Sequence, residues 1–336
     1  MCTLFWALQY HPQYKFVFAG NRDEFLSRPT ALASWWNNST ILGGRDLQNP
    51  QNAGTWLGIN RYGRFVAVTN YRGPNQIPKV KTVIDEDKRQ LVSRGVLVKK
   101  ILESQEKPLD EIMRVEIEAT AENYGGYNII AVDLANQEKN KTTNENNDDI
   151  DCHMFYFANR HNIRLQTLRN GEIYGISNSV LDDPWPKVEM GKREFRKILE
   201  NKTLSENDIT IPFKSTTSTI PEILEDIRFT IHVPECKIHE TYATRTNTIV
   251  LVDHSNRVVF VERTVHDETR ANNYCYSHIS RDRFNPDNVI TSDTLIPIKG
   301  SNEKESSEEI TQQQFFESNN HKSRIFQFKI QRNVIN

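Results

Sequence analysis

The sequence predicts an α+β protein built as a four-layer αββα sandwich, with two β-sheets stacked face to face and helices on the outside. Three observations lead to this prediction. Short strands joined by hairpin turns fill the first third of the 336-residue chain, two helical stretches follow, and further strands surround a third helix. Because two sheets of this kind bury one face each on the other, helices are expected to cover the outer faces.

Apolar and aromatic runs bounded by turn residues predict the strands. The clearest hairpin turns lie at 10–13, 61–63 and 253–256. The run 127–133 has almost no polar residue, which is typical of a strand covered on both faces. The predicted strands are 3–9, 15–19, 55–60, 64–70, 127–133, 153–158, 163–168, 172–177, 246–252 and 257–263.

Three stretches carry helical signals. The first is 85–103, the second begins after Pro108, since proline is favoured in a first helical turn, and the third is 187–200. The irregular stretch 201–240 has a short helical signal near Pro221. The apolar face of the first helix is formed by Leu91, Val92, Gly95, Val98, Ile101 and Leu102.

We expect one αββα domain over residues 1–265. Residues 134–151 carry too little apolar surface to offset the entropy of ordering, so we predict a disordered surface insertion there. The chain from 266 to 336 is polar and lacks a pattern. It is predicted to be a loosely attached, partly disordered extension.

Composition excludes several classes of partner. The 42 basic and 44 acidic residues nearly cancel, so nothing indicates a nucleic-acid partner or a basic membrane surface. No apolar run approaches the roughly 18 residues that span a bilayer, and we expect no transmembrane segment. The four cysteines are dispersed and the histidines lack paired spacing, so we expect no metal and no cofactor. These features predict an intracellular protein, and they leave its oligomeric state open.

Cys2 is the most informative single residue. Removal of Met1 would leave a thiol and a free α-amine on one residue, which then carries its own nucleophile and base. With unperturbed pKa values of about 8.5 for the thiol and about 7.7–8.0 for the amine, activation needs a nearby charge. Twenty residues on, Arg22 could stabilise the thiolate and Asp23 could hold the α-ammonium. These two residues belong to the polar tetrad Asn21 to Glu24, and the alternative is that the tetrad is a solvated turn.

Acyl transfer also needs donors for the developing oxyanion. Asn70 and Asn178 each follow an apolar strand and are the candidates, although asparagine is also common in turns. Trp185 follows a proline-rich turn and could line a pocket, and the glycine-rich segments 43–46 and 54–58 are predicted to be loops near a ligand.

These motifs together resemble the transport and Golgi organisation 2 family, which is also named for its Asn-Arg-Asp-Glu motif. The resemblance covers about residues 1–265. It rests on Met1-Cys2-Thr3, Asn21–Glu24, Gly43–Asp46, Gly54–Gly58, Asn70-Tyr71-Arg72, Gly126-Tyr127-Asn128, Ser177-Asn178, Leu181–Lys187 and Thr244–Thr248.

More distantly, the layout is similar to the choloylglycine hydrolases and penicillin V acylases, which cleave amides with an N-terminal cysteine in an αββα fold. That resemblance implies an N-terminal-nucleophile site with Cys2, Arg22, Asp23, Asn70 and Asn178 as catalytic residues. In those enzymes the order of the Arg and Asn in the tetrad is exchanged, and their second catalytic arginine has no clear counterpart here. The residues expected to bind the substrate are Asn21, Glu24, Tyr71, Trp185 and Arg245.

The nearer family implies a cytoplasmic role in secretion and Golgi organisation, with links to mitochondria, lipid metabolism and haem. Three molecular hypotheses remain. The first is an amidohydrolase or acyltransferase that acts through Cys2. The second is a non-catalytic carrier that holds haem or an acyl lipid in the same cleft. The third is an interaction scaffold that does not use these residues. The expected ligand is therefore an amide, an acyl thioester or haem.

Overall fold

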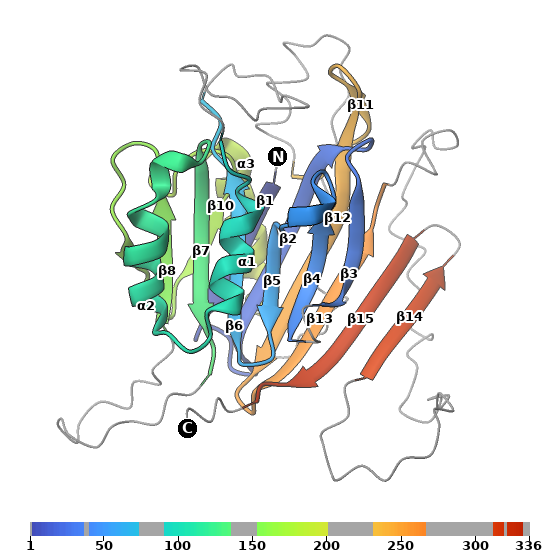
Figure 1. The fold of residues 1–336 in the computed structure, drawn as a ribbon. Coiled ribbons are helices and arrows are strands. Elements are labelled where there is room, and N and C mark those ends of the chain that lie inside the picture. Colours follow the sequence, from blue (N-terminus) through green and yellow to red (C-terminus); the bar gives the residue numbers. More distant parts are fainter. Residues whose placement is uncertain are drawn as a thin grey trace, which may run out of the picture.

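The computed structural model describes residues 2–36, 40–73, 91–135, 153–200, 231–266, 312–318 and 321–331. Two antiparallel sheets are stacked face to face in this part of the chain, and helices lie on their outer faces (Figure 1). The predicted four-layer αββα sandwich is confirmed.

The first sheet, sheet A, follows the order β10-β1-β2-β12-β13-β15-β14, with β11 paired to β12. Strands β1 and β2 form the hairpin predicted at the N-terminus, and β12 and β13 form the predicted closing hairpin. Its strands are β1 (Cys2–Leu8), β2 (Tyr14–Phe25), β10 (Ile173–Ile176), β11 (Cys236–Lys237), β12 (Thr241–Asp253), β13 (Arg257–Thr264), β14 (Gln312–Ser318) and β15 (His321–Lys329).

The second sheet, sheet B, follows the chain from β3 to β9 in sequence order. The predicted hairpin around 61–63 joins β5 and β6. The strands of sheet B are β3 (Thr30–Trp36), β4 (Ile41–Asp46), β5 (Leu57–Asn60), β6 (Arg64–Asn70), β7 (Tyr127–Asp133), β8 (His153–Ala158) and β9 (Gln166–Thr167).

Helices cover the outer face of each sheet. Helix α3 (Pro186–Leu199) packs on sheet A, where Gly191 lies so close to Phe5 that an added Cβ would come within 2.1 Å of its ring. Helix α1 (Gly95–Glu103) and the continuous pair α2 (Leu109–Glu111) and η2 (Ile112–Glu118) pack on sheet B. Two single turns, η1 (Pro50–Asn52) and η3 (Ala121–Asn123), complete the described helices.

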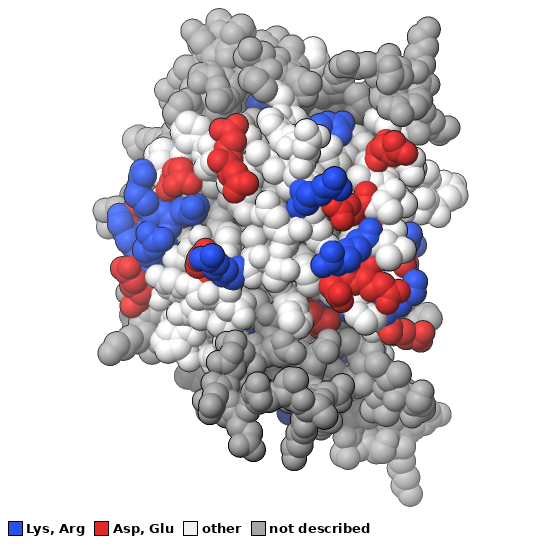
Figure 2. All heavy atoms as spheres, turned by 90° about the vertical axis from the view of Figure 1, so that its left-hand side faces the viewer, with Lys and Arg blue, Asp and Glu red and all other residues white. Residues whose placement is uncertain are grey.

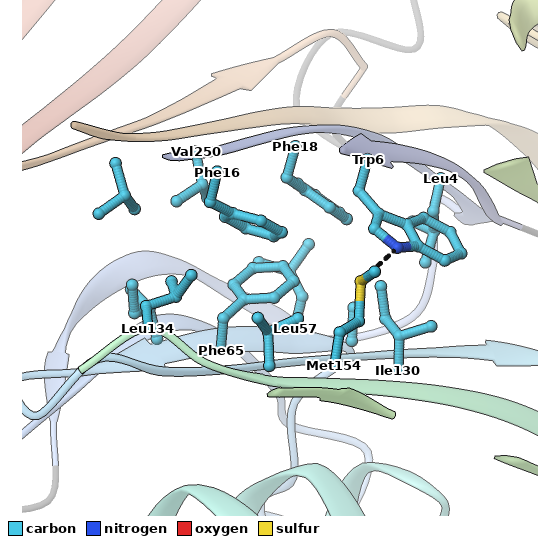
Figure 3. Close-up of a cluster of buried hydrophobic side chains, with 14 of the residues drawn as sticks. Leu4, Trp6, Phe16, Phe18, Leu57, Phe65, Ile130, Leu134, Met154 and Val250 are labelled. Carbon is cyan, nitrogen blue, oxygen red and sulfur yellow. Dashed lines mark hydrogen bonds between the residues drawn. The ribbon is translucent and has the colours of Figure 1, made fainter. Parts of the chain in front are cut away.

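The largest apolar cluster lies between the two sheets. Side chains of Leu4, Trp6 and Phe18 from sheet A meet Phe65 and Met154 from sheet B (Figure 3). The Trp6 indole donates a hydrogen bond to the Met154 sulfur at 3.1 Å. Alternate residues of β1 face the other way, toward α3, so this strand is buried on both faces.

Several predicted segments differ from the structure. Strand β2 extends six residues beyond the predicted end at 19 and includes the whole Asn21–Glu24 tetrad, so the tetrad is not a turn. The segment predicted to be a glycine-rich loop at 43–46 is part of strand β4. The predicted strand 163–168 is reduced to β9, and helix α1 begins at Gly95. The start of the helix predicted at 85, the short helix near Pro221 and nearly all of the 134–151 insertion lie outside the described residues.

The C-terminal segment contributes to the sandwich where a loosely attached tail was predicted. Strand β15 pairs with β13 over eight residues, from Arg257 opposite Lys329 to Thr264 opposite Lys322. Phe326 and Phe328 are buried in the cluster between the sheets. The prediction of a loosely attached extension was therefore wrong for β15. Two phenylalanines at alternate positions of this strand pack on an apolar sheet face and anchor it there.

No described helix is long and apolar enough to cross a membrane. On the face shown in Figure 2, basic and acidic side chains are interspersed, in keeping with the near balance of charges in the sequence.

Truncation of Phe326 tests the role of β15. We expect Phe326→Ala to lower the free energy of unfolding by about 3–5 kcal/mol, because it leaves a cavity between the sheets. Gln327→Ala, at an exposed position of the same strand, serves as the control and should change it by less than about 0.5 kcal/mol. Equal effects of the two variants in urea unfolding would contradict the assignment of β15 to the core.

Glu262 on β13 gives a pH test of the packing between the sheets. Its buried carboxylate accepts a hydrogen bond from the Ala33 amide at 2.6 Å, and burial raises its pKa to about 7. The folded protein therefore holds a proton that the unfolded chain has lost between about pH 4.5 and 7. Stability should fall by about 3 kcal/mol as pH rises through this range.

The measurement is chemical unfolding at several pH values. Glu262→Gln keeps an oxygen for the Ala33 amide and should lack this fall, whereas exposed Glu194→Gln should retain it. A fall of the same size in Glu262→Gln would show that another group causes it.

Candidate functional site

Strand register places Cys2 directly opposite Arg22, at the end of the β1–β2 hairpin. Directly opposite residues of an antiparallel pair have their side chains on the same face of the sheet. Cys2 packs against the cluster between the two sheets, so its half-buried thiol lies on the inner face of sheet A. Thr246 of β12 is opposite Arg22 on the other side, which makes Cys2, Arg22 and Thr246 neighbours in one row.

The guanidinium of Arg22 is held on this inner face. It stacks over the Trp56 ring at 4.1 Å and donates a hydrogen bond to the Thr30 hydroxyl at 3.1 Å. Two polar atoms beside it, Trp56 Nε1 and Thr246 Oγ1, are buried and have no hydrogen-bond partner in the described part of the chain. Both groups can donate, so a carbonyl or anionic oxygen placed here would find two unused donors beside a cation.

Asp23 points to the opposite face of sheet A, toward the layer of helix α3. The Thr244 hydroxyl donates to Asp23 Oδ1 at 2.6 Å, and the Tyr242 hydroxyl donates to the Asp23 carbonyl oxygen at 2.9 Å. Burial raises the pKa of this carboxyl, while the positive charges of the N-terminal ammonium and Lys187 oppose the rise. Asp23 is therefore close enough to interact with a charge at the start of the chain.

The thiol of Cys2 is not activated by its surroundings alone. Burial raises its pKa, and the negative charges of Asp23 and Glu24 raise it further. The N-terminal ammonium and Arg22 act in the opposite direction without cancelling the effect of burial. A reaction through this thiol therefore needs a group that accepts its proton.

Asn178 joins the ends of the two sheets next to Cys2. Its side-chain Nδ2 donates to the Asn70 backbone carbonyl oxygen at 2.5 Å. Its backbone carbonyl oxygen accepts from the Arg72 backbone amide at 2.7 Å. The Ser177 hydroxyl lies 2.8 Å from the Cys2 carbonyl oxygen and 3.2 Å from Asn178 Oδ1. The structure thus brings Asn178 and Cys2 together through one serine, with Asn178 fully buried. Asn70 contributes its backbone, and the residue itself is exposed.

Two buried cations that the sequence reasoning missed lie against the ring of the predicted pocket residue Trp185. Arg72 stacks over its ring at 4.8 Å, and the Lys187 amine lies 5.6 Å from the ring centroid. Lys187 is fully buried in the first turn of α3, and burial lowers its pKa to about 8, an effect that the Asp23 carboxylate opposes. A lysine within the apolar stripe of α3, next to Val188 and ahead of Gly191, was the signal for it.

The remaining predicted binding residues are spread around this centre. The Asn21 amide donates to the Ile231 carbonyl oxygen at 2.8 Å and accepts from the Asn247 amide at 2.6 Å. Tyr71 is hydrogen-bonded to His161 at 2.7 Å. Arg245 donates to the carbonyl oxygens of Phe25, the last residue of β2, and of Arg28 in the turn that follows.

Glu24 is the link between Arg22 and a second group of charges. Its carboxylate lies 4.0 Å from Arg22 Nη2 and 3.7 Å from Arg28 Nε. Arg28 in turn forms an ion pair with Asp46 at 2.7 Å. Among the described residues, no cluster of three or more His, Cys, Asp or Glu could hold a metal ion.

A cavity of about 640 Å³ lies away from Cys2, between η2, η3 and the turn after β8. It contains none of the predicted catalytic residues. The residues that line it are Leu91, Glu118, Ala121, Glu122, Tyr124, Phe157, Ala158, Asn159, Arg160, Asn162, Ile163 and Arg164.

Comparison with known proteins finds close relatives for most of the chain. The model of the family "Transport and Golgi organisation 2" matches residues 1–267. The mouse (Mus musculus) transport and Golgi organization 2 homolog is 33% identical over 287 residues, which cover 80% of this chain and 94% of the relative. The human (Homo sapiens) transport and Golgi organization protein 2 homolog is 32% identical over 286 residues, with the same coverage of both chains.

Among solved structures, the Caenorhabditis elegans ortholog of N-acylethanolamine-hydrolyzing acid amidase aligns with 74% of this chain and 92% of its own. The sequence identity is 13% and the TM-score is 0.39.

The pKa of Lys187 predicts how stability depends on pH at this site. Between about pH 8 and 10.5 the unfolded chain binds a proton on this lysine that the folded protein does not bind, so stability should rise with pH. The gain amounts to about 3 kcal/mol across this range. Lys187→Met should lack this gain. The free energies of unfolding of variant and wild type, measured by chemical unfolding at several pH values, should therefore diverge by that amount between pH 8 and 10.5.

The control is Lys192→Met, a change to a half-buried lysine on the same helix. It should follow the wild type at every pH. If Lys187→Met and the wild type ran parallel from pH 8 to 10.5, the charge of Lys187 would not be suppressed in the folded protein.

Proposed function

The chain belongs to the transport and Golgi organisation 2 family, and from this premise we propose that it acts in protein secretion and Golgi organisation through acyl-transfer or amide-cleaving chemistry at Cys2. The proposal places the working protein in the cytoplasm, at the Golgi or mitochondria. Its substrate is a small amide or acyl thioester.

One observation carries the proposal. The row formed by Cys2, Arg22 and Thr246 combines a thiol, a cation and the unused hydroxyl donor of Thr246. The indole of Trp56, which stacks with Arg22, adds a second unused donor. A thiol attacking a carbonyl carbon drives negative charge onto the carbonyl oxygen, and preorganised donors in a dry site stabilise that charge most. Thr246 and Trp56 therefore join Asn178 as donors in the proposed site.

The proposed mechanism requires that Met1 be absent from the working protein. The α-amine of Cys2 takes the thiol proton, and the thiolate sulfur attacks the substrate carbonyl carbon. Asp23, on the opposite face of the strand end, holds the resulting ammonium by its charge. Collapse of the tetrahedral intermediate breaks the bond to the leaving group, which takes the proton from the ammonium. A thioester at Cys2 remains and is released to water or to another acceptor.

Arg22, Trp56, Thr246 and Asn178 share the charge of the oxyanion in this proposal. An amide Nδ2 carries two hydrogens, and Asn178 uses one for the Asn70 carbonyl oxygen. The second hydrogen is available to the intermediate. Asn70 acts by fixing Asn178, while Trp185 packs against the cations Arg72 and Lys187, and the charge of Lys187 acts on Asp23.

A second candidate is a carrier that binds haem or an acyl lipid at this site without cleaving it. The raised pKa of the Cys2 thiol favours it, since a protonated thiol is a poor nucleophile and a compact apolar lining suits a ligand that is only held. The two candidates differ in whether the sulfur of Cys2 is needed for more than packing.

The first experiment is the intact mass of the purified protein before and after limiting iodoacetamide. We expect a chain without Met1 that is alkylated first at Cys2, with Cys236→Ser as the control that retains this reaction. Cys2→Ala should lower turnover of a panel of acyl amides and acyl thioesters by more than about a hundredfold, because no nucleophile remains. Its far-ultraviolet circular dichroism spectrum should remain that of the wild type.

Retained Met1, or turnover that persists in Cys2→Ala, would refute the proposed mechanism. In that case saturable binding of haemin or of a non-hydrolysable acyl thioester, weakened in Arg22→Met and unchanged in the exposed control Arg169→Met, would support the carrier. Equal binding by both arginine variants would exclude it.

A further inference from the structure

Three adjacent strands of sheet B each carry one buried polar side chain on the face that meets sheet A. These are Thr69 of β6, Asn128 of β7 and Tyr156 of β8, and at most 1% of each is exposed. Thr69 and Asn128 are directly opposite in the register, so they share a face, and Tyr156 lies one step along it, opposite Ile130. Tyr156 and Ile130 belong to the apolar cluster between the sheets. We call the three side chains the polar trio.

The polar trio forms one chain of hydrogen bonds with a fixed direction. The Tyr156 hydroxyl donates to Asn128 Oδ1 at 2.9 Å, and Asn128 Nδ2 donates to the Thr69 hydroxyl at 3.1 Å. The second hydrogen of Asn128 Nδ2 goes to the Ser179 carbonyl oxygen at 2.8 Å. An amide turned the other way would place its oxygen against that carbonyl oxygen, so only one orientation of Asn128 satisfies the network.

The polar trio holds the backbone of residues 177–181, which follow β10. The Thr69 hydroxyl donates to the Ser177 carbonyl oxygen at 2.6 Å, and the Leu181 amide donates to the Tyr156 hydroxyl at 3.0 Å. Together with the bond that β7 makes to the same segment, three successive strands of sheet B hold a segment that leaves sheet A. The segment is not part of a described strand, so its buried backbone groups need side-chain partners of this kind.

The held segment contains the residues that contact the start of β1. Asn178 lies between Ser177 and Ser179, whose carbonyl oxygens accept from the polar trio. The Ser177 hydroxyl lies 2.8 Å from the Cys2 carbonyl oxygen and 3.4 Å from the Thr3 hydroxyl. A path of hydrogen bonds therefore leads from sheet B through one serine to the N-terminal cysteine, and it passes on both sides of the asparagine that lies beside it.

We propose that Asn128 is a positioning residue of the Cys2 site, which acts by fixing the segment 177–181 and with it the place of Asn178. The inference rests on the proposed function, because it concerns the distance between the sulfur that attacks and the amide that stabilises the oxyanion. A misplacement of about 1 Å can cost about a hundredfold in rate. Apolar side chains would fill the same space between the sheets, whereas a fully satisfied network also holds the segment rigidly in one place.

The test compares Asn128 with a matched asparagine at the other end of sheet B. Asn128→Asp keeps the shape of the side chain but replaces Nδ2, which donates twice, by an oxygen with at most one hydrogen. The control is Asn60→Asp, because buried Asn60 donates to the Leu102 carbonyl oxygen at 2.9 Å and accepts from the Arg64 amide at 2.9 Å. The control loses the same kind of bond at the start of β6, whereas the polar trio lies at its end.

Two milder changes keep the test decisive if Asn128→Asp folds poorly. Tyr156→Phe removes one hydroxyl of the network. Its control is Tyr127→Phe, a change to a buried tyrosine that packs in the apolar cluster on the helix-covered face of sheet B. Thr69→Val removes the other hydroxyl at nearly constant shape, and Thr69→Ser retains it.

Two measurements report position rather than stability. For the amide or thioester that the wild type turns over, kcat should fall by about tenfold or more in Asn128→Asp, Tyr156→Phe and Thr69→Val, with KM within about twofold. Alkylation of Cys2 by limiting iodoacetamide, followed by peptide mass, should be faster by about threefold or more in these variants, because release of the strand end hydrates the half-buried thiol. Both controls and Thr69→Ser should match the wild type in both measurements, even where their free energy of unfolding falls.

Equal kcat and equal alkylation rates in Asn128→Asp and Asn60→Asp would overturn the inference and leave the polar trio as a support of the fold alone. A loss in Thr69→Ser as large as that in Thr69→Val would also overturn it, because the hydroxyl would then have no role. Failure of the proposed function gives a different result. Turnover then persists in Cys2→Ala, or no substrate of the panel is turned over, and the alkylation rates alone decide the role of the polar trio.

Discussion

Burial of strand β1 on both faces is the constraint on which the rest of the structure depends. Leu4, Trp6 and Leu8 fill the space between the sheets, while Phe5 and Ala7 face helix α3. A strand in this position tolerates polar groups only at its end, where they can still find hydrogen-bond partners. Cys2 is at that end, so its neighbours in the register become the candidate site.

The buried charges around Cys2 are stabilised mainly by one another. Burial raises the pKa of the Asp23 carboxyl and lowers that of the Lys187 amine, and each charge reduces the shift of the other. Trp185 lies beside Lys187 and Arg72 and provides its ring face to both cations. Such groups cost stability that an apolar set would not, and perturbed groups of this kind gather at functional sites more often than elsewhere.

Glu24 connects the Cys2 site with a second group of charges. Its carboxylate is near Arg22 on one side and Arg28 on the other, and its charge also acts on Arg94. The Asn-Arg-Asp-Glu tetrad therefore serves two places at once. Arg22 faces the cluster between the sheets and Asp23 faces helix α3, because successive residues of a strand point to opposite faces. This division of the tetrad explains how four adjacent polar residues can be placed in a buried strand.

Local sequence was sufficient for much of the fold. Hairpins and helices that rest on short-range patterns, such as the pairs β1–β2 and β12–β13, were predicted from apolar runs and turn residues. Strand β4 was missed because Gly43 and Gly44 are typical turn residues. They are required in the sheet, since a Cβ on Gly44 would lie 2.3 Å from the Trp56 ring and one on Gly43 would lie 2.6 Å from the Leu57 carbonyl oxygen. Strand β15 was missed because its only signal is the alternation around Phe326 and Phe328.

The sequence by itself determined the layers of the fold, the position of Cys2 on the first strand and the tetrad that lies beside it. Tertiary structure alone decided which charges meet. Lys187 lies far from Asp23 along the chain and becomes its neighbour only when α3 packs on sheet A. Arg72 meets Trp185 only where Asn178 ties the end of β6 to the end of β10. Periodicity describes one element at a time, whereas the energy of a buried charge depends on every element packed around it.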